Sequence, residues 1–179
     1  DGQSLDLIFR GIATAYQDGT QALPPMRLQA HDVAVHEQMR LADPKDSLAE
    51  SKRFWHKQLS APVAPLELPS DRPRPLIKTT RGKIAPFTFS NALSRDLLAA
   101  GQSGDGGVFP LLVALVNTLF HRLTGQSDIC IGTAITTRTR AELADQVGFH
   151  VATVVLRSQI DSTSSFSTVW KGCAQTVRD

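Results

Sequence analysis

The residue types in this chain that could act in chemistry are few and widely spaced. The five histidines are His31, His36, His56, His121 and His150. None pairs with a glutamate in the H-E-x-x-H pattern of a zinc protease, and no G-x-S-x-G nucleophile motif occurs. His121 falls at the end of an apolar helical pattern, where an imidazole favours helix termination. Local spacing therefore indicates neither a metal site nor a catalytic triad.

Two stretches stand out instead. The chain opens with DGQS, in which Asp1-Gly2 is typical of a bend yet leads straight into an amphipathic helical pattern. Residues 130–157 read CIGTAITTRTRAELADQVGFHVATVVLR. There a β-branched run enters a bend that carries Arg138 and Arg140, a short acidic helix follows, and a second β-branched run comes after it.

The elements that must position these residues follow from the apolar periodicity. It predicts helices over residues 5–16, 47–59, about 93–98, 111–123 and 166–177, and strands over 83–90, 128–136 and 151–160. Helix 47–59 has Ser47 and Glu50 at capping-box spacing. Helix 111–123 is apolar on nearly every side and is expected to be buried all round, while strand 151–160 is apolar enough to be central. This mixture without a regular βαβ repeat predicts an α/β or α+β fold around a mixed sheet.

A proline-rich segment divides the pattern. Residues 61–75 hold five prolines, which predicts a stiff extended connector and a boundary. The glycine-rich loop at 101–107 lacks the spacing of a phosphate-binding loop and is interpreted as a turn.

Composition excludes several classes. The 19 basic and 17 acidic residues are spread along the chain, which disfavours a nucleic-acid partner. Cys130 and Cys173 form no C-x-x-C pair, which favours two buried thiols in a reducing compartment. No apolar stretch reaches membrane-spanning length and no leader pattern precedes Asp1, so a cytoplasmic location and no membrane partner are expected.

Residues 130–157 resemble the condensation domain of non-ribosomal peptide synthetases. The matching positions are Gly132, Arg138, Arg140, Glu142, Leu143, Val147, Gly148, Val151, Thr153 and Arg157. The resemblance extends along the chain through FWHKQL (54–59), LELPSDRPRP (66–75) and HRLTGQSDICIG (121–132). Each piece alone is weak, but together they follow the family's order and spacing.

The resemblance implies a chloramphenicol-acetyltransferase-like, two-lobed fold that this chain represents only in part. Residues 1–65 would end the N-terminal lobe, 66–82 would cross between lobes, and 83–179 would begin the C-terminal lobe. Asp1 and Gly2 would be the tail of a catalytic motif of two histidines, three residues, Asp and Gly. The second histidine, the family's catalytic residue, would then stand four positions before Asp1, outside this chain.

The implied activity is amide bond formation in antibiotic and other secondary metabolism. An acyl or peptidyl thioester would be joined to an aminoacyl thioester, each held on the phosphopantetheine arm of a carrier protein. No cofactor would bind the domain directly. Its partners would be carrier proteins, neighbouring synthetase domains and the rest of the same domain.

Two roles for Asp1 stay open. In one hypothesis its carboxylate accepts from Arg138 in a partly buried ion pair that fixes the histidine loop. In the other it only caps the first helix.

The family also implies that His150, Ala152 and Thr153 line the substrate channel. This chain departs from the family there, with His150 for Phe and Ala152 for Asn, and elsewhere with Ala134 for Pro and His36 for Trp. An imidazole in an extended segment is more often packed or hydrogen-bonded than catalytic.

Alternative functions fit the same motifs. One is a degenerate, docking-only module that binds carrier proteins without catalysis, and others are sister epimerisation or heterocyclisation domains. The isolated chain is expected to be inactive because the catalytic histidine lies outside it.

Overall fold

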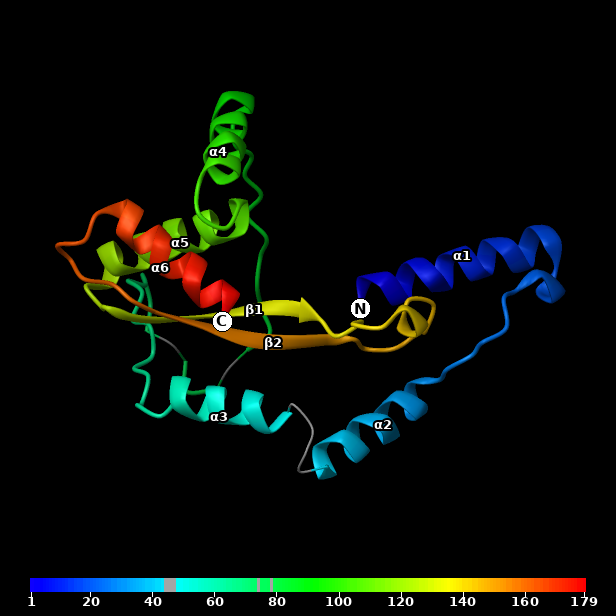
Figure 1. Cartoon of the computed structure of the whole chain (residues 1–179). Helices are drawn as coiled ribbons and strands as arrows, with labels where there is room; N and C mark the ends of the chain where they lie inside the picture. The colour runs from blue at the N-terminus through cyan, green and yellow to red at the C-terminus, as the bar shows by residue number, and fades with distance from the viewer. Residues whose placement is uncertain (44–47, 74, 78) are drawn as a thin grey trace. The chain divides into compact units, whose positions relative to one another are not determined.

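The computed structural model describes residues 1–43, 48–73, 75–77 and 79–179. These residues form the helices α1 (Gly2–Asp18), α2 (Ala30–Ala42), α3 (Leu48–Gln58), α4 (Asn91–Ser103), α5 (Val108–Thr124) and α6 (Phe166–Arg178), the strands β1 (Asp128–Thr136) and β2 (Val151–Gln159), and the 3-10 turns η1 (Thr20–Ala22) and η2 (Ala141–Leu143) (Figure 1).

Local sequence signals account for the ends of most helices. Asp1 caps α1 by accepting from the Ser4 N–H, and Ser165 caps α6 by accepting from the Thr168 N–H. Gly125, at φ 72°, ends α5 in the left-handed conformation that glycine adopts without strain. The capping box predicted for α3 involves Ser47, which lies outside the described residues.

The two strands are antiparallel neighbours. The Thr137 N–H donates to the His150 carbonyl at 3.0 Å beyond one end of the ladder, and the Ile160 N–H donates to the Ser127 carbonyl at 2.8 Å beyond the other. The predictions of strands at 128–136 and 151–160 are confirmed to within one residue. In the described part of the chain β2 pairs only with β1, so the prediction that it is a central strand is wrong there.

Two further predictions of secondary structure need correction. Residues 83–90 form no strand: they are irregular and exposed, because no other described segment pairs with them and Pro86 removes a donor. Helix α2 was also missed, because its apolar residues are spread around the helix and give only a weak helical periodicity.

Helix α5 is also less buried than its composition predicts. Its inner side is buried, but Leu119 and Leu123 are about half exposed, at 53% and 50%. Among the described residues, α4 and α6 are the helices with extensive contacts to α5, which leaves its other side uncovered.

The chain divides into two compact units, each discontinuous in sequence. The first unit contains Asp1–Ala61 and Gly132–Val154, and the second contains Pro62–Ile131 and Val155–Asp179. The assignment of residues 1–65, 66–82 and 83–179 to parts of two lobes stays a prediction.

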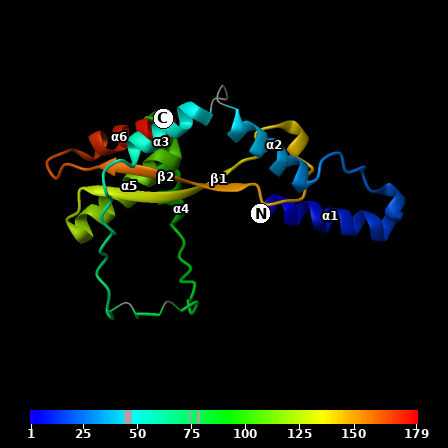
Figure 2. The ribbon, with the colours of Figure 1, turned by 90° about the horizontal axis from the view of Figure 1, so that it is seen from below.

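The core of the second unit lies between α5, α6 and the end of β2. Both ribbon views show α5 and α6 side by side (Figures 1 and 2). Val113 and Ala114 of α5 pack with Leu156 of β2 and Cys173 of α6. Fully buried Asn117 donates to the Ser158 hydroxyl at 2.9 Å within this core. Of the two cysteines, Cys173 is buried as expected, whereas Cys130 is half-buried.

Within the described residues, no single helix is both long and apolar enough to span a membrane. Helices α4 and α5 meet the length and composition test only together, and a bend of 112° separates them.

Candidate functional site

Asp1 ties the start of α1 to the segment that precedes β2. Its Oδ1 accepts from the Ser4 N–H at 2.8 Å, and its Oδ2 accepts from the His150 N–H at 3.0 Å. Both contacts lie in the first unit, although the donors are far apart in sequence. The carboxylate therefore does more than cap a helix.

Arg138 provides the charge opposite Asp1. Its Nη2 lies 3.2 Å from Oδ1 and 3.3 Å from Oδ2 of Asp1, and the side chains are only 5% and 7% exposed. The structure thus brings together the two residues of the hypothesised ion pair. Removing one partner of a pair buried to this degree leaves the other charge without compensation, which is strongly destabilising.

The rest of the Arg138 guanidinium binds backbone. Its Nη1 donates to the Gln146 carbonyl at 2.8 Å and to the Leu143 carbonyl, so it also holds the loop that follows η2. Its Nε is buried and has no hydrogen-bond partner among the described residues. Arg138, which follows β1, therefore connects the loop before β2 with the start of α1.

Ser4 is a member of this network that the sequence analysis did not single out. It is the buried residue of α1, and its hydroxyl contacts Arg138 and both backbone polar groups of Gly148. Its position three residues after Asp1 was the available signal, but a serine in a first helical turn is ordinarily interpreted as capping.

Gln146 was missed as well, and it accompanies His150. The His150 side chain is buried, and its Nε2 is hydrogen-bonded to Oε1 of Gln146. Burial lowers the pKa of the His150 imidazole, and the nearby Arg138 charge lowers that pKa further. Both effects favour the neutral form of the imidazole, which is hydrogen-bonded to Gln146.

The remaining predicted site residues differ in their exposure to solvent. Gly2 is exposed in the first turn of α1, Ala152 is half-buried and Thr153 is exposed. The Thr153 γ-methyl lies 3.3 Å from where a side chain at Gly132 would begin, so the two strands approach closely there. The channel-lining role of His150, Ala152 and Thr153 stays a prediction.

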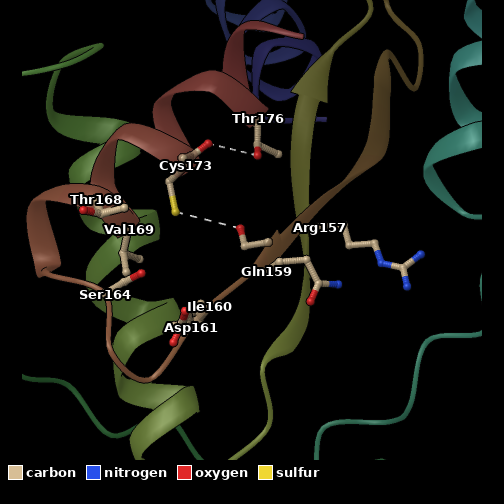
Figure 3. Close-up of a pocket in the computed structure, with 11 residues that line it drawn as sticks. Arg157, Gln159, Ile160, Asp161, Ser164, Thr168, Val169, Cys173 and Thr176 are labelled. Carbon is tan, nitrogen blue, oxygen red and sulfur yellow. Dashed lines mark hydrogen bonds between the residues drawn. The ribbon is translucent and has the colours of Figure 1, made fainter.

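Two hollows are lined by residues outside this network. One, of about 110 Å³, lies in the second unit between the end of β2 and α6, where Cys173 and Ser158 line it (Figure 3). The other lies beside Trp55 of α3 in the first unit. No predicted site residue lines either of them. The described residues contain no group of three or more acidic, histidine or cysteine side chains suited to a metal ion.

Comparisons with known proteins place this geometry in a family. The family model of the condensation domain matches residues 1–179, so the chain belongs to the condensation domain family. The chain is 33% identical over 183 residues to phosphinothricin tripeptide synthetase PhsB of Streptomyces viridochromogenes. That match covers 99% of this chain but 15% of the relative, so the chain spans a small part of the synthetases it matches.

Solved structures agree on the fold. The X-domain from teicoplanin biosynthesis matches with a TM-score of 0.89 at 24% identity, over 99% of this chain and 41% of that one. The first condensation domain of the calcium-dependent antibiotic synthetase matches with a TM-score of 0.68 at 22% identity, over 99% and 39%. The predicted mixed helix-and-strand fold of chloramphenicol-acetyltransferase type, represented in part, is confirmed.

Proposed function

We propose that residues 1–179 are the central part of a condensation domain that forms an amide bond in non-ribosomal peptide synthesis. The observation that carries the proposal is the fixed carboxylate of Asp1. It accepts from Arg138, from the Ser4 N–H and from the His150 N–H, so the aspartate at the tail of the expected histidine motif has three separate hydrogen-bond donors.

The proposed reaction joins two carrier-bound thioesters. The amine of the aminoacyl group attacks the carbonyl carbon of the acyl or peptidyl thioester. A C–N bond forms, the C–S bond breaks, and the proton lost by the amine ends on the departing thiol. Because a thioester is already activated, positioning the amine supplies much of the rate.

The histidine expected four positions before Asp1 would orient the amine or carry its proton. Asp1 and Arg138 would act on this step indirectly, since the turn they fix would carry the histidine. Their contribution is therefore to position it, and Gly2 would continue the same turn into α1.

The partners follow from the proposed activity. Both substrates would arrive on phosphopantetheine arms of carrier proteins, in a cytoplasmic synthetase that makes a secondary metabolite. His150, Ala152 and Thr153 would lie beside the channel in which the arms meet. The apolar side chain of Ala152 and the hydroxyl of Thr153 would then affect which substrates are accepted.

An assay of single-turnover amide formation tests the proposal. A domain that contains residues 1–179 and the upstream histidine is mixed with donor and acceptor carrier proteins loaded with their thioesters. We expect amide product, and a loss of roughly 10²- to 10⁴-fold in rate when that histidine is replaced by alanine. Equal rates for the two proteins would contradict the proposal.

The same assay separates the docking-only alternative. The X-domain of teicoplanin biosynthesis, which shares this fold, has been solved in complex with OxyB. A domain that binds loaded carrier proteins but yields no amide would support a docking role in place of catalysis. The isolated chain of 179 residues is expected to form no amide, because the catalytic histidine lies outside it.

A further inference from the structure

We propose that Ser4 is a positioning residue for amide formation, because its hydroxyl clasps the start of α1 to Gly148. This inference rests on the proposed function and deepens it, since it assigns a role to a side chain that touches no substrate. Ser4 is 5% exposed, so its part in the reaction must be exerted through the protein.

The hydrogen bonds of the Ser4 hydroxyl use its full capacity. A serine hydroxyl has one hydrogen to donate and two lone pairs that accept. Ser4 Oγ donates to the Gly148 carbonyl at 2.6 Å, and accepts from the Gly148 N–H at 3.0 Å and from Arg138 Nη2 at 2.9 Å. Every contact is with a different polar group, so the orientation of the hydroxyl is fixed.

Two side chains lie close to Gly148, the residue that the Ser4 hydroxyl binds. A side chain at Gly148 would begin 2.9 Å from Oε1 of Gln146 and 3.0 Å from Nε2 of His150. Both atoms are at the ends of side chains, so the distances show that the Gln146 and His150 side chains fold back over Gly148. Ser4 is therefore hydrogen-bonded to a segment, residues 146–150, that the Gln146–His150 hydrogen bond also stabilises.

The clasp and the Asp1 carboxylate act on the same turn. Asp1 is joined to the His150 N–H, Ser4 is joined to Gly148, and Arg138 contacts both side chains. Together they fix the first turn of α1 against residues 146–150. The histidine expected four positions before Asp1 would be attached to this turn, so loosening Ser4 would shift the imidazole from its working position.

The test compares Ser4→Ala with a matched control in the domain that contains residues 1–179 and the upstream histidine. Ser4→Ala is expected to slow single-turnover amide formation by roughly 10- to 100-fold, because a misplacement of about 1 Å can have that effect. The dissociation constants for loaded carrier proteins should stay within about twofold, since buried Ser4 cannot touch them.

Ser165→Ala is the control. It removes another serine hydroxyl at a helix start, the cap of α6 in the second unit, and should lower the melting temperature by about 2–4 °C. Its rate of amide formation should be unchanged. A third variant, Ser4→Cys, retains a weaker donor and acceptor and should give an intermediate rate.

Hydrogen exchange of the Gly148 amide provides a readout apart from activity. Exchange should be faster in Ser4→Ala and unchanged in Ser165→Ala. A wild-type rate in Ser4→Ala, or a loss no larger than that of Ser165→Ala, would overturn the inference. If the wild-type domain made no amide, the proposed function and the positioning role would both fall, whereas unchanged Gly148 exchange alone would refute only the clasp.

Discussion

At the scale of single residues, the site depends on one buried guanidinium. Arg138 binds the Asp1 carboxylate, the Ser4 hydroxyl and the carbonyls of Leu143 and Gln146. Its planar fork can reach these groups at once, whereas a lysine offers a single point charge. The contacts explain why an arginine stands here and predict that its replacement will be costly.

We predict that Arg138→Ala lowers the free energy of unfolding by about 3–5 kcal/mol, because it leaves the buried Asp1 carboxylate without its countercharge. Arg138→Lys should lose less, since the charge remains while the backbone contacts do not. Chemical denaturation of the two variants and the wild type checks this order. Arg140→Ala, which removes an exposed arginine two residues along, is the control and should be near neutral. Equal stabilities for Arg138→Ala and wild type would contradict the prediction.

His150 predicts a dependence of stability on pH. Because the folded protein holds the pKa of this imidazole below its ordinary value, the unfolded chain binds the proton more tightly. Protonation of His150 in acid therefore favours the unfolded chain. The free energy of unfolding should fall as the pH drops below about 6.5.

His150→Phe should remove this part of the pH dependence, because phenylalanine does not titrate. Denaturation midpoints between pH 5 and pH 8 measure the effect. An unchanged slope in His150→Phe would show that another group is responsible.

At the scale of elements, close packing of α4 against α5 gives a further prediction. A side chain at buried Gly101 would begin 2.6 Å from Cγ2 and 2.8 Å from Cα of Val108. The backbone atom cannot move aside cheaply. Gly101→Ala should therefore destabilise the protein by about 1–3 kcal/mol, although alanine is the better helix former.

Gly172 of α6 is the matched control, since nothing lies within 4 Å of the position that its side chain would take. Gly172→Ala should raise stability by up to about 1 kcal/mol through helix propensity alone. Thermal denaturation distinguishes the two substitutions. If Gly101→Ala were also stabilising, the close packing of α4 on α5 would be wrong.

The elements also show what sequence patterns can and cannot predict. Strands β1 and β2 were predictable because each is a β-branched run of strand length bounded by polar residues. Apolar and polar residues alternate equally well in residues 83–90. A strand also needs a second strand to pair with, and the alternation of residues does not show whether one is present. Ser4 escaped notice for a similar reason, since its partner Gly148 lies 144 residues away and only folding reveals it.

At the scale of the whole molecule, the family and the fold were within reach of the sequence because several short motifs occur in one order. The ion-pair hypothesis drew on that order, since Asp1 and Arg138 are 137 residues apart. The loop contacts of Gln146 and the clasp of Ser4 depend on side-chain geometry that no motif encodes. Those contacts are what distinguish a positioned turn from a simple helix cap.

Replacing Asp1 with asparagine separates these two roles. Asparagine caps a helix about as well as aspartate, but it carries no charge for Arg138. If Asp1 only caps α1, the substitution should have little effect on the protein. If the charge fixes the histidine-bearing turn, the substitution should impair amide formation.

The most direct test is the single-turnover rate of amide formation by Asp1→Asn in the domain that contains residues 1–179 and the upstream histidine. Asp6→Asn, the same change at an exposed carboxylate of α1, is the control. We predict a loss of about 10- to 100-fold for Asp1→Asn and a wild-type rate for Asp6→Asn. Equal rates for both variants would contradict this prediction.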